Sequence, residues 1–130
     1  MADVGKTILI IDDDAVLSEL YRVKFVRAGF TVLQAESGTK AIEILRGSVQ
    51  PAVILLDLLM PNMDGFAFIQ EARHKGLHLP PLIVFTSQGG DIHKMKSFAL
   101  GAAHFVQKAN ATPKEILELI NSILEKKLPQ

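Results

Sequence analysis

Short runs of consecutive apolar residues recur along the chain, and a stretch with the helical spacing of apolar positions follows each run. Uninterrupted apolar runs are typical of strands buried on both faces, as in a parallel sheet covered by helices. Such strands are expected at residues 8–11, 31–34, 53–56, 82–85 and 105–107. The pattern therefore predicts five βα units in series, which is the organisation of an α/β domain.

The stretches between these runs carry recognisable helix boundaries. Gly29 is expected to end the first helix, Ser37 and Gly47 to bound the second, Asp64 to begin the third and Gly89-Gly90 to precede the fourth. The apolar residues that give these stretches their helical period are Leu17, Leu20, Tyr21, Phe25, Ala41, Ile42, Leu45, Phe66, Ile69, Ala72, Ile92, Met95 and Ala99.

The last helix has the clearest start. Thr112, Pro113 and Glu115 combine an N-cap residue, a proline at the first helical position and the glutamate of a capping box. The apolar stripe that follows consists of Ile116, Leu117, Ile120, Ile123 and Leu124.

The polarity of the strands predicts their order in the sheet. The first, third and fourth strands are wholly apolar, whereas the second carries Thr31 and Gln34 and the fifth carries His104 and Gln107. More polar strands belong at the edges, which favours the order 2-1-3-4-5. Right-handed crossovers then place helices on both faces of a parallel five-stranded, doubly wound sheet.

Composition narrows the class of protein. A chain of 130 residues forms one domain, and its 48% hydrophobic and 22% charged residues are typical of an ordinary globular protein. Fourteen basic and fourteen acidic residues cancel, so no net charge favours nucleic acid or an anionic membrane. No apolar stretch approaches the ~20 residues of a membrane span. The absence of cysteine excludes disulfides and thiolate metal sites, and the cytoplasm is the expected location.

The central strands run directly into side chains with oxygen atoms. Asp12-Asp13-Asp14 follows the first strand, Asp57 the third and Thr86 the fourth, while Lys108 follows the fifth. Because ligands of open parallel sheets bind at the carboxyl ends of the strands, these groups are expected to converge on one edge. The sequence therefore predicts a polar site at that edge.

Several carboxylates close together indicate a bound cation. Crowded carboxylates raise one another's pKa unless a cation joins them, and a small all-oxygen site suits Mg²⁺. Asp12, Asp13 and Asp57 are the candidate ligands, and Asp14 is assigned to capping the first helix. The alternative for Asp13 is that it only contributes to this cap. Together with Thr86 and Lys108, a cation would surround an anion such as a phosphoryl group.

These residues stand in a characteristic series of short motifs. The series comprises Ile-Leu-Ile-Ile-Asp12-Asp13-Asp14, Asp57-Leu-Leu-Met-Pro61-Asn-Met-Asp-Gly65, Thr86-Ser87, Phe105 and Lys108. In these motifs and their intervals the chain resembles the receiver domain of two-component response regulators, over essentially its whole length, and single-domain chemotaxis-type regulators in particular.

The resemblance implies a flavodoxin-like fold and phosphorylation of Asp57 by a histidine kinase or phosphotransfer protein. It implies Mg²⁺ as the cofactor, held by the Asp12, Asp13 and Asp57 carboxylates and the backbone carbonyl of Leu59. Thr86 would be the switch hydroxyl, Phe105 the switch aromatic and Lys108 the lysine that pairs with the phosphate.

Among the departures from the pattern of the family, one follows Lys108 and another is at Phe105. Ala109 follows Lys108 where family members usually have proline, so the sequence leaves open whether that peptide bond is cis. Phe105 has no hydroxyl, so any aromatic switching must depend on packing alone.

The leading interpretation is a phosphoryl-accepting switch, not an enzyme acting on an external substrate. One alternative is a degenerate receiver used only for docking, and another is a Mg²⁺-dependent aspartyl phosphotransferase or phosphatase. That class has a second catalytic carboxylate two residues after the nucleophile, where this chain has Leu59.

The chain is expected to be a single receiver domain, 1–130, with a core at about 6–127 and no output domain. The expected output is a protein contact through the face formed by the fourth helix, the fifth strand and the last helix. No contact with nucleic acid or a membrane is expected, and the protein is expected to be a monomer or a weak dimer.

Overall fold

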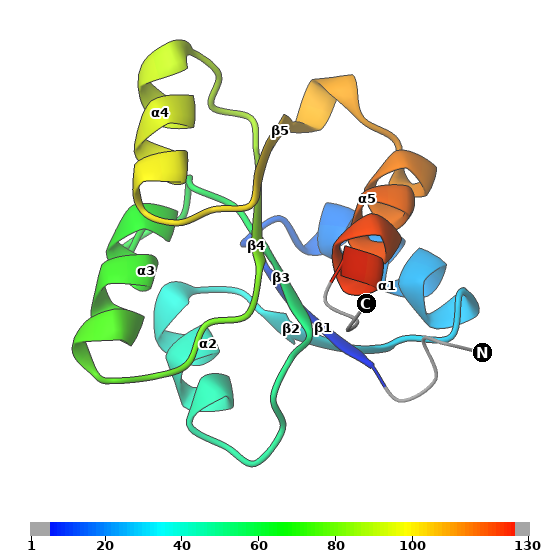
Figure 1. Ribbon diagram of the computed structural model, residues 1–130, viewed down its shortest axis with the longest axis horizontal. Helices are drawn as coiled ribbons and strands as arrows, with labels where there is room; N and C mark the ends of the chain where they lie inside the picture. The colour runs from blue at the N-terminus through cyan, green and yellow to red at the C-terminus, as the bar shows by residue number, and fades with distance from the viewer. Residues whose placement is uncertain (1–5, 127–130) are drawn as a thin grey trace.

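The computed structural model describes residues 6–126 and consists of a central sheet with helices on both sides (Figure 1). The expected end of the core at residue 127 lies just outside the described residues. In chain order the elements are β1 (Thr7–Ile11), α1 (Ala15–Arg27), β2 (Thr31–Ala35), α2 (Gly38–Leu45), β3 (Val53–Leu56), α3 (Gly65–His74), β4 (Leu82–Thr86), α4 (Asp91–Ala99), β5 (His104–Gln107), the 3₁₀ helix η1 (Lys108–Asn110) and α5 (Pro113–Lys126).

All neighbouring strands are parallel, and their order is β2-β1-β3-β4-β5, as the sequence predicts. The apolar strands β1, β3 and β4 form the centre, and the more polar β2 and β5 form the edges. The register aligns Ile11 with Leu56, so the next residues of β1 and β3 emerge side by side. It also aligns Thr86 with Gln107, which brings the ends of β4 and β5 level.

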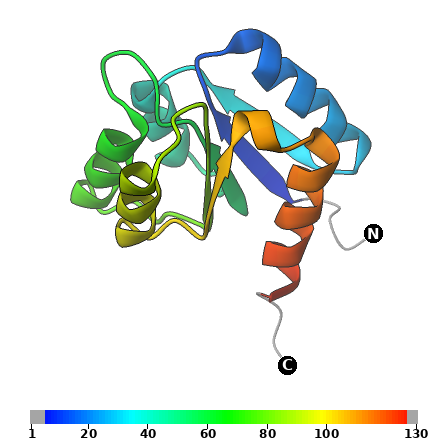
Figure 2. The same cartoon turned by 90° about the horizontal axis from the view of Figure 1, so that it is seen from above.

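The helices form two layers, one on each face of the sheet (Figure 2). Helices α1 and α5 cover one face, and α2, α3 and α4 lie on the other. Because side chains of a strand point alternately to opposite faces, the central strands β1, β3 and β4 contribute to both cores. The core under α1 and α5 contains Ile8, Ile10, Tyr21, Phe25, Phe30, Val53, Leu55, Ile83, Phe85, Ile116, Ile120 and Ile123. The core under α2 and α3 contains Leu9, Ile11, Ala35, Ala41, Ile42, Leu45, Ile54, Leu56, Met60, Phe68, Ile69, Ala72 and Leu82.

The predicted helix caps are confirmed. The side chains of Asp14, Ser37 and Asp64 accept hydrogen bonds from backbone amides in the first turns of α1, α2 and α3. At α5, the amide of Thr112 donates to Glu115 Oε1 over 2.9 Å, and the amide of Glu115 donates to Thr112 Oγ1 over 3.2 Å. This reciprocal pair is the predicted capping box.

Two helices differ from the expected apolar stripes. Leu20 has the right spacing in α1 but is exposed, because the buried side of α1 is set by Ser18, Tyr21 and Phe25. In α4 the difference is larger. Ile92 and Met95 are 80% and 70% exposed, and the residue that α4 buries is Ser97. The Ser97 hydroxyl donates to the carbonyl of His93 over 2.7 Å, which allows a polar residue to be buried there.

Between residues 6 and 126, none of the helices has both the length and the apolar character that crossing a membrane requires.

Candidate metal and anion site

The carboxyl ends of β1 and β3 place two buried aspartates next to each other. Asp12 follows Ile11 and Asp57 follows Leu56, and only 6% of Asp12 and 3% of Asp57 are exposed. The amide of Asp57 donates to the carbonyl of Ile11 over 2.9 Å, which extends the hydrogen-bond ladder one residue beyond the carboxyl end of β3. The prediction that these carboxylates share one edge of the sheet is confirmed.

A third carboxylate completes the group. One carboxylate oxygen from each of Asp12, Asp13 and Asp57 can be chosen so that all lie within 4.8 Å of one another, with Asp13 at the exposed side. Carboxylates this close repel one another, and an arrangement of hard oxygen atoms around one point is what a small divalent cation requires.

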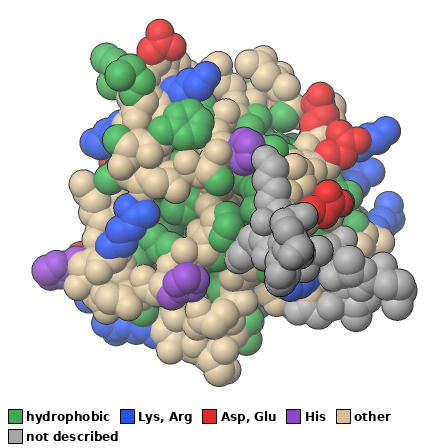
Figure 3. Space-filling model, viewed as in Figure 1, with side chains coloured by type: hydrophobic (Ala, Val, Ile, Leu, Met, Phe, Trp, Pro, Cys, Tyr) green, Lys and Arg blue, Asp and Glu red, His purple; other side chains and the backbone are tan. Residues whose placement is uncertain are grey.

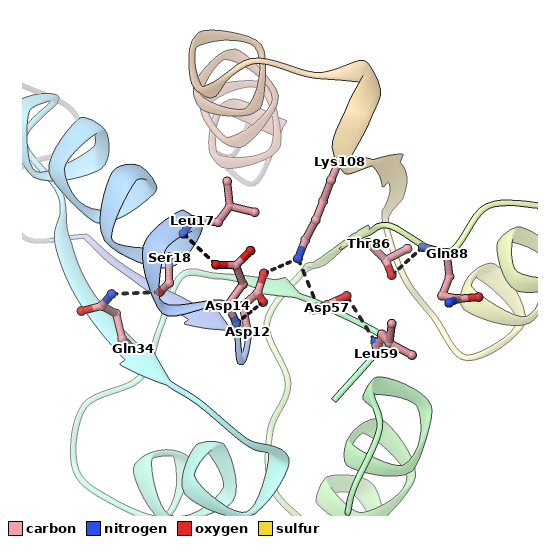
Figure 4. Close-up of polar contacts among 10 residues, drawn as sticks. All are labelled: Asp12, Asp14, Leu17, Ser18, Gln34, Asp57, Leu59, Thr86, Gln88 and Lys108. Carbon is pink, nitrogen blue, oxygen red and sulfur yellow. Dashed lines mark hydrogen bonds and ion pairs between the residues drawn. The ribbon is translucent and has the colours of Figure 1, made fainter. Parts of the chain in front are cut away.

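Lys108 reaches into the group from the end of β5 (Figure 4). Its Nζ atom lies 2.8 Å from Asp12 Oδ2 and 3.3 Å from Asp57 Oδ2, and its side chain is largely buried. Burial lowers the pKa of the Lys108 ammonium, but the hydrogen bonds and charges of Asp12 and Asp57 outweigh burial and raise the pKa. Lys108 therefore remains a fixed positive charge between the two aspartates.

The environment of Asp12 disfavours its charged form, although Lys108 lies next to it. Burial raises the pKa of its carboxyl, the charge of Asp57 adds to the increase, and the bonds from Lys108 and from the amide of Asp14 oppose it. Burial therefore favours the neutral form of this carboxyl, and a cation bound next to it would favour the charged form.

Local turns hold the two buried carboxylates in place. Asp12 Oδ1 accepts from the amide of Asp14 over 2.9 Å, and Asp57 Oδ1 accepts from the amide of Leu59 over 3.2 Å. Asp14 itself turns to α1, where its Oδ1 accepts from the amide of Leu17 over 3.1 Å. The assignment of Asp14 to helix capping is thus confirmed.

Thr86 is the last residue of β4, at the edge of the sheet where the carboxylates lie. Phe105 lies on the neighbouring strand β5, two residues before its end. Thr86 is completely buried, and its Oγ1 accepts from the amide of Gln88 over 3.1 Å. Phe105 pairs in register with Val84 and packs on a small cluster of Leu58, Phe66, Val84 and Ala102. Its side chain is half-buried, so part of the ring remains at the surface.

The sequence leaves open whether the peptide bond between Lys108 and Ala109 is cis, and the structure shows which isomer is present. The Lys108–Ala109 peptide bond is trans, and Lys108 begins the short helix η1. The lysine therefore reaches Asp12 and Asp57 from a trans backbone.

One residue with a structural role at the site was not singled out for that role by sequence reasoning. A Cβ atom at Gly65 would lie 2.6 Å from the carbonyl oxygen of Asp57 and 2.9 Å from the Leu58 Cα. Only glycine allows α3 to begin this close to the loop that follows β3. The signal was present in the sequence, because Gly65 ends the Asp57–Gly65 motif.

The comparisons with known proteins agree with this geometry. A family model described as the response regulator receiver domain matches residues 8–121. The phosphate regulon transcriptional regulatory protein PhoB of Pseudomonas aeruginosa is 30% identical over 127 residues, which cover 97% of this chain and 55% of PhoB. The DNA-binding dual master transcriptional regulator RpaA of a Synechocystis species is 33% identical over 95% of this chain and 52% of its own length. The chain spans about half the length of the curated relatives it matches.

Solved structures show the same fold. The chemotaxis protein CheY4 of Vibrio cholerae superposes with a TM-score of 0.81 at 24% identity, covering 91% of this chain and 98% of that one. The receiver domain of the Francisella response regulator 1452 superposes with a TM-score of 0.85 at 20% identity, covering 95% of this chain and all (100%) of that one.

Proposed function

Because this chain belongs to the response regulator receiver domain family of two-component systems, we propose that it is a phosphoryl-accepting switch in which Asp57 is the acceptor. The donor would be a histidine kinase or a phosphotransfer protein, and the location would be the cytoplasm. One observation carries the assignment of the acceptor. Lys108 joins Asp57 to Asp12, and Asp13 completes a group of carboxylates on the same edge of the sheet.

The donor set fits Mg²⁺. The carboxylates of Asp12, Asp13 and Asp57 would hold the ion, and the backbone carbonyl of Leu59 is the remaining protein ligand we propose. When bound, Mg²⁺ would supply positive charge against the repulsion between an aspartate and an incoming phosphoryl group.

The protein's own side chains would do the rest of the work at the acceptor. A carboxylate oxygen of Asp57 would attack phosphorus while the bond from phosphorus to the donor's imidazole nitrogen breaks. The ammonium of Lys108, already 3.3 Å from Asp57 Oδ2, would donate to a phosphoryl oxygen and stabilise the added charge.

Thr86 would report the change. Its oxygen accepts from the amide of Gln88, which leaves the hydroxyl hydrogen available to donate to a phosphoryl oxygen. Each hydrogen bond to a charged group contributes about 1.5–3 kcal/mol. Moving a two-state equilibrium from rare to dominant takes about 5 kcal/mol, so contacts of this kind from Thr86 and Lys108 are of the right size.

Phe105 would carry the change to the surface. Its ring packs on the cluster that contains Val84, two residues before Thr86, and part of the ring is exposed. A movement of Thr86 toward the acceptor would change the packing of this ring and thereby the surface formed by α4, β5 and α5. We propose that a downstream protein binds this surface, in a monomer or weak dimer of this chain.

The relatives carry names that describe transcriptional regulators, but the chain matches only about half of their length. The part of the chain described has a receiver fold, and we propose that it acts through protein contacts and not through contacts with nucleic acid or a membrane. A phosphoacceptor of this kind would assist its own modification without being a multiple-turnover enzyme on an external substrate.

Incubation with acetyl phosphate and Mg²⁺, followed by intact mass measurement, tests the proposal. We expect the mass to increase by one phosphoryl group, and we expect Asp57→Asn to abolish the increase. A degenerate receiver used for docking would not gain mass. An aspartyl phosphatase would release inorganic phosphate from acetyl phosphate in many turnovers without keeping the modification.

Asp14→Asn is the matched control. Asparagine caps helices as well as aspartate does, and Asp14 is occupied with the amide of Leu17. We therefore expect Asp14→Asn to keep the gain in mass. A gain that survives in Asp57→Asn would contradict the proposal.

A further inference from the structure

A cleft lies on the side of α4 that faces the loop between β3 and α3. Its volume is about 350 Å³, which is in the range of small binding sites. Its apolar walls come from Leu58, Leu59, Phe66 and Ile92. Leu58 and Phe66 belong to a buried cluster, whereas Ile92 and Leu59 are mainly exposed to solvent.

This concentration of exposed apolar surface calls for an explanation. Single exposed hydrophobic residues are normal, but contiguous ones around a depression mark interaction sites. Met95, one turn along α4 from Ile92, is also mainly exposed. Hydrophobic side chains are visible on the outer surface over α4 in the space-filling view, with basic side chains beside them (Figure 3).

The charge of the cleft identifies the kind of ligand that complements it. The ammonium of Lys96 lies 4.6 Å from the centroid of the Phe66 ring, and the His93 ring stacks on Phe66 at a centroid distance of 6.4 Å. Among the ion pairs of residues 6–126, none involves Lys96. The one acidic residue that lines the cleft, Asp64, accepts from the amide of Ala67 as the cap of α3. The cleft therefore combines an apolar floor with a cation that has no carboxylate partner.

The cleft also touches the backbone of the acceptor site. Its lining includes Leu59, whose amide donates to Asp57 Oδ1, and Gln88, whose amide donates to Thr86 Oγ1. It shares no residue with the cleft on the other side of α4, which Lys94, Phe105 and Gln107 help to line. A molecule bound here would thus lie beside the acceptor and apart from the surface formed by β5 and α5.

We propose that this cleft docks an amphipathic segment of a partner protein, which inserts a large apolar side chain between Phe66 and Ile92 and places a carboxylate on Lys96. This surface is additional to the one formed by α4, β5 and α5. Docking needs only the contacts just described, and all of them are present without phosphorylation of Asp57.

A display library of short random peptides, selected on the bare full-length protein without phosphodonor, tests the proposal. We expect the enriched peptides to share a large apolar residue with an aspartate or glutamate within one helical turn of it. The amide signals of Leu59, Phe66 and Gln88 should shift in NMR spectra when a synthetic copy of such a peptide is added.

Matched variants decide whether the cleft is the binding site. We expect Ile92→Ser and Lys96→Ala each to weaken binding of the peptide about tenfold, as loss of an anchor or its ion pair would. Val26→Ser removes an exposed apolar residue from α1, and Lys94→Ala removes a cation from the other side of α4, so both should bind as the wild type does. Thermal unfolding checks that all four variants fold.

Other outcomes would overturn the proposal. Peptides whose affinity is the same in Ile92→Ser and Lys96→Ala, or selection that enriches no common pattern, would show that the cleft is not a docking site for such a segment. Sedimentation that shows a wild-type dimer, dissociated by Ile92→Ser, would identify a second copy of the chain as the occupant instead. None of these measurements requires phosphorylation, so they fail or succeed independently of the acceptor assignment.

Discussion

Helices α5 and α4 flank the same edge strand, β5, yet they use their apolar side chains in opposite ways. Helix α5 buries Ile116, Ile120 and Ile123 against the sheet, whereas α4 exposes Ile92 and Met95 and buries Ser97. Each fully buried large aliphatic side chain contributes about 1.5–3 kcal/mol. Helix α5 is therefore anchored by its packing, and α4 is held by much less.

The first turn of α5 is also held by more hydrogen bonds from side chains than the first turn of α4. The reciprocal bonds between Thr112 and Glu115 close the first turn of α5, whereas the N-cap of α4 is Gly90, which offers no side chain. Because displacement of a helix costs the contacts that hold it, a modest event at the acceptor can move α4 more readily than α5. This difference supports the proposal that the surface containing α4 responds to the state of the site.

The largest test of this comparison is to shorten one isoleucine on each helix. Ile120→Ala should lower the free energy of unfolding by about 2–5 kcal/mol, because Ile120 is completely buried and a cavity would remain. Ile92→Ala should change it by less than about 0.5 kcal/mol, because Ile92 is exposed. Urea denaturation of both variants gives the two values. Equal losses would show that α4 is packed as firmly as α5.

The sequence predicted α5 far better than α4, for a physical reason. Both helices have apolar residues at helical spacing, and this spacing specifies a stripe without specifying what the stripe contacts. In α5 the stripe and the capping box agree with the packing. In α4 the buried position is Ser97, and its burial depends on a hydrogen bond to His93 that no spacing rule indicates. Leu20 in α1 was misplaced for the same reason.

The site, like the helices, could be predicted only in part from the sequence. That Asp12 and Asp57 would meet could be predicted, because both end buried central strands and parallel strands align their carboxyl ends. The position of the Lys108 ammonium between them could not, because it depends on where a long flexible side chain points. The cleft beside Leu59 could not be predicted either, because it arises from the relative position of α4 and the loop before α3.

A second test targets the one residue that α4 buries. Ser97→Leu should cost about 1–3 kcal/mol in the free energy of unfolding, because extra methylenes must enter a fully buried position. Ser97→Ala is the control and should cost less, since the hydroxyl bonds only to a carbonyl of its own helix. We also expect Ser97→Leu to shift the NMR signals of Phe66 and His93, which lie on this side of α4. A Ser97→Leu variant as stable as the wild type would mean that α4 moves away at almost no cost.

A third test weakens the start of α5. Thr112→Ala removes the capping oxygen and should lower the free energy of unfolding by about 1 kcal/mol, whereas Thr112→Ser should retain most of it. Chemical denaturation provides the measurement. A loss in Thr112→Ser as large as that in Thr112→Ala would mean that the hydroxyl is not what stabilises this turn.

The smallest expected effect is a pH dependence of the free energy of unfolding, which arises from the buried carboxyl of Asp12. Burial raises the pKa of Asp12 above its ordinary value of 3.8, and Lys108 opposes much of that increase. In the metal-free protein the folded state therefore holds this proton to a higher pH than the unfolded state does. The free energy of unfolding should accordingly fall as pH rises from 3.8 through the raised pKa, and the cost should be constant above it.

Asp12→Asn should flatten this part of the profile, measured by urea denaturation in EDTA, whereas Asp91→Asn on the exposed start of α4 should leave it unchanged. Profiles for the wild type and Asp12→Asn that run parallel through this range would show that Lys108 already compensates the cost of burying the Asp12 carboxylate.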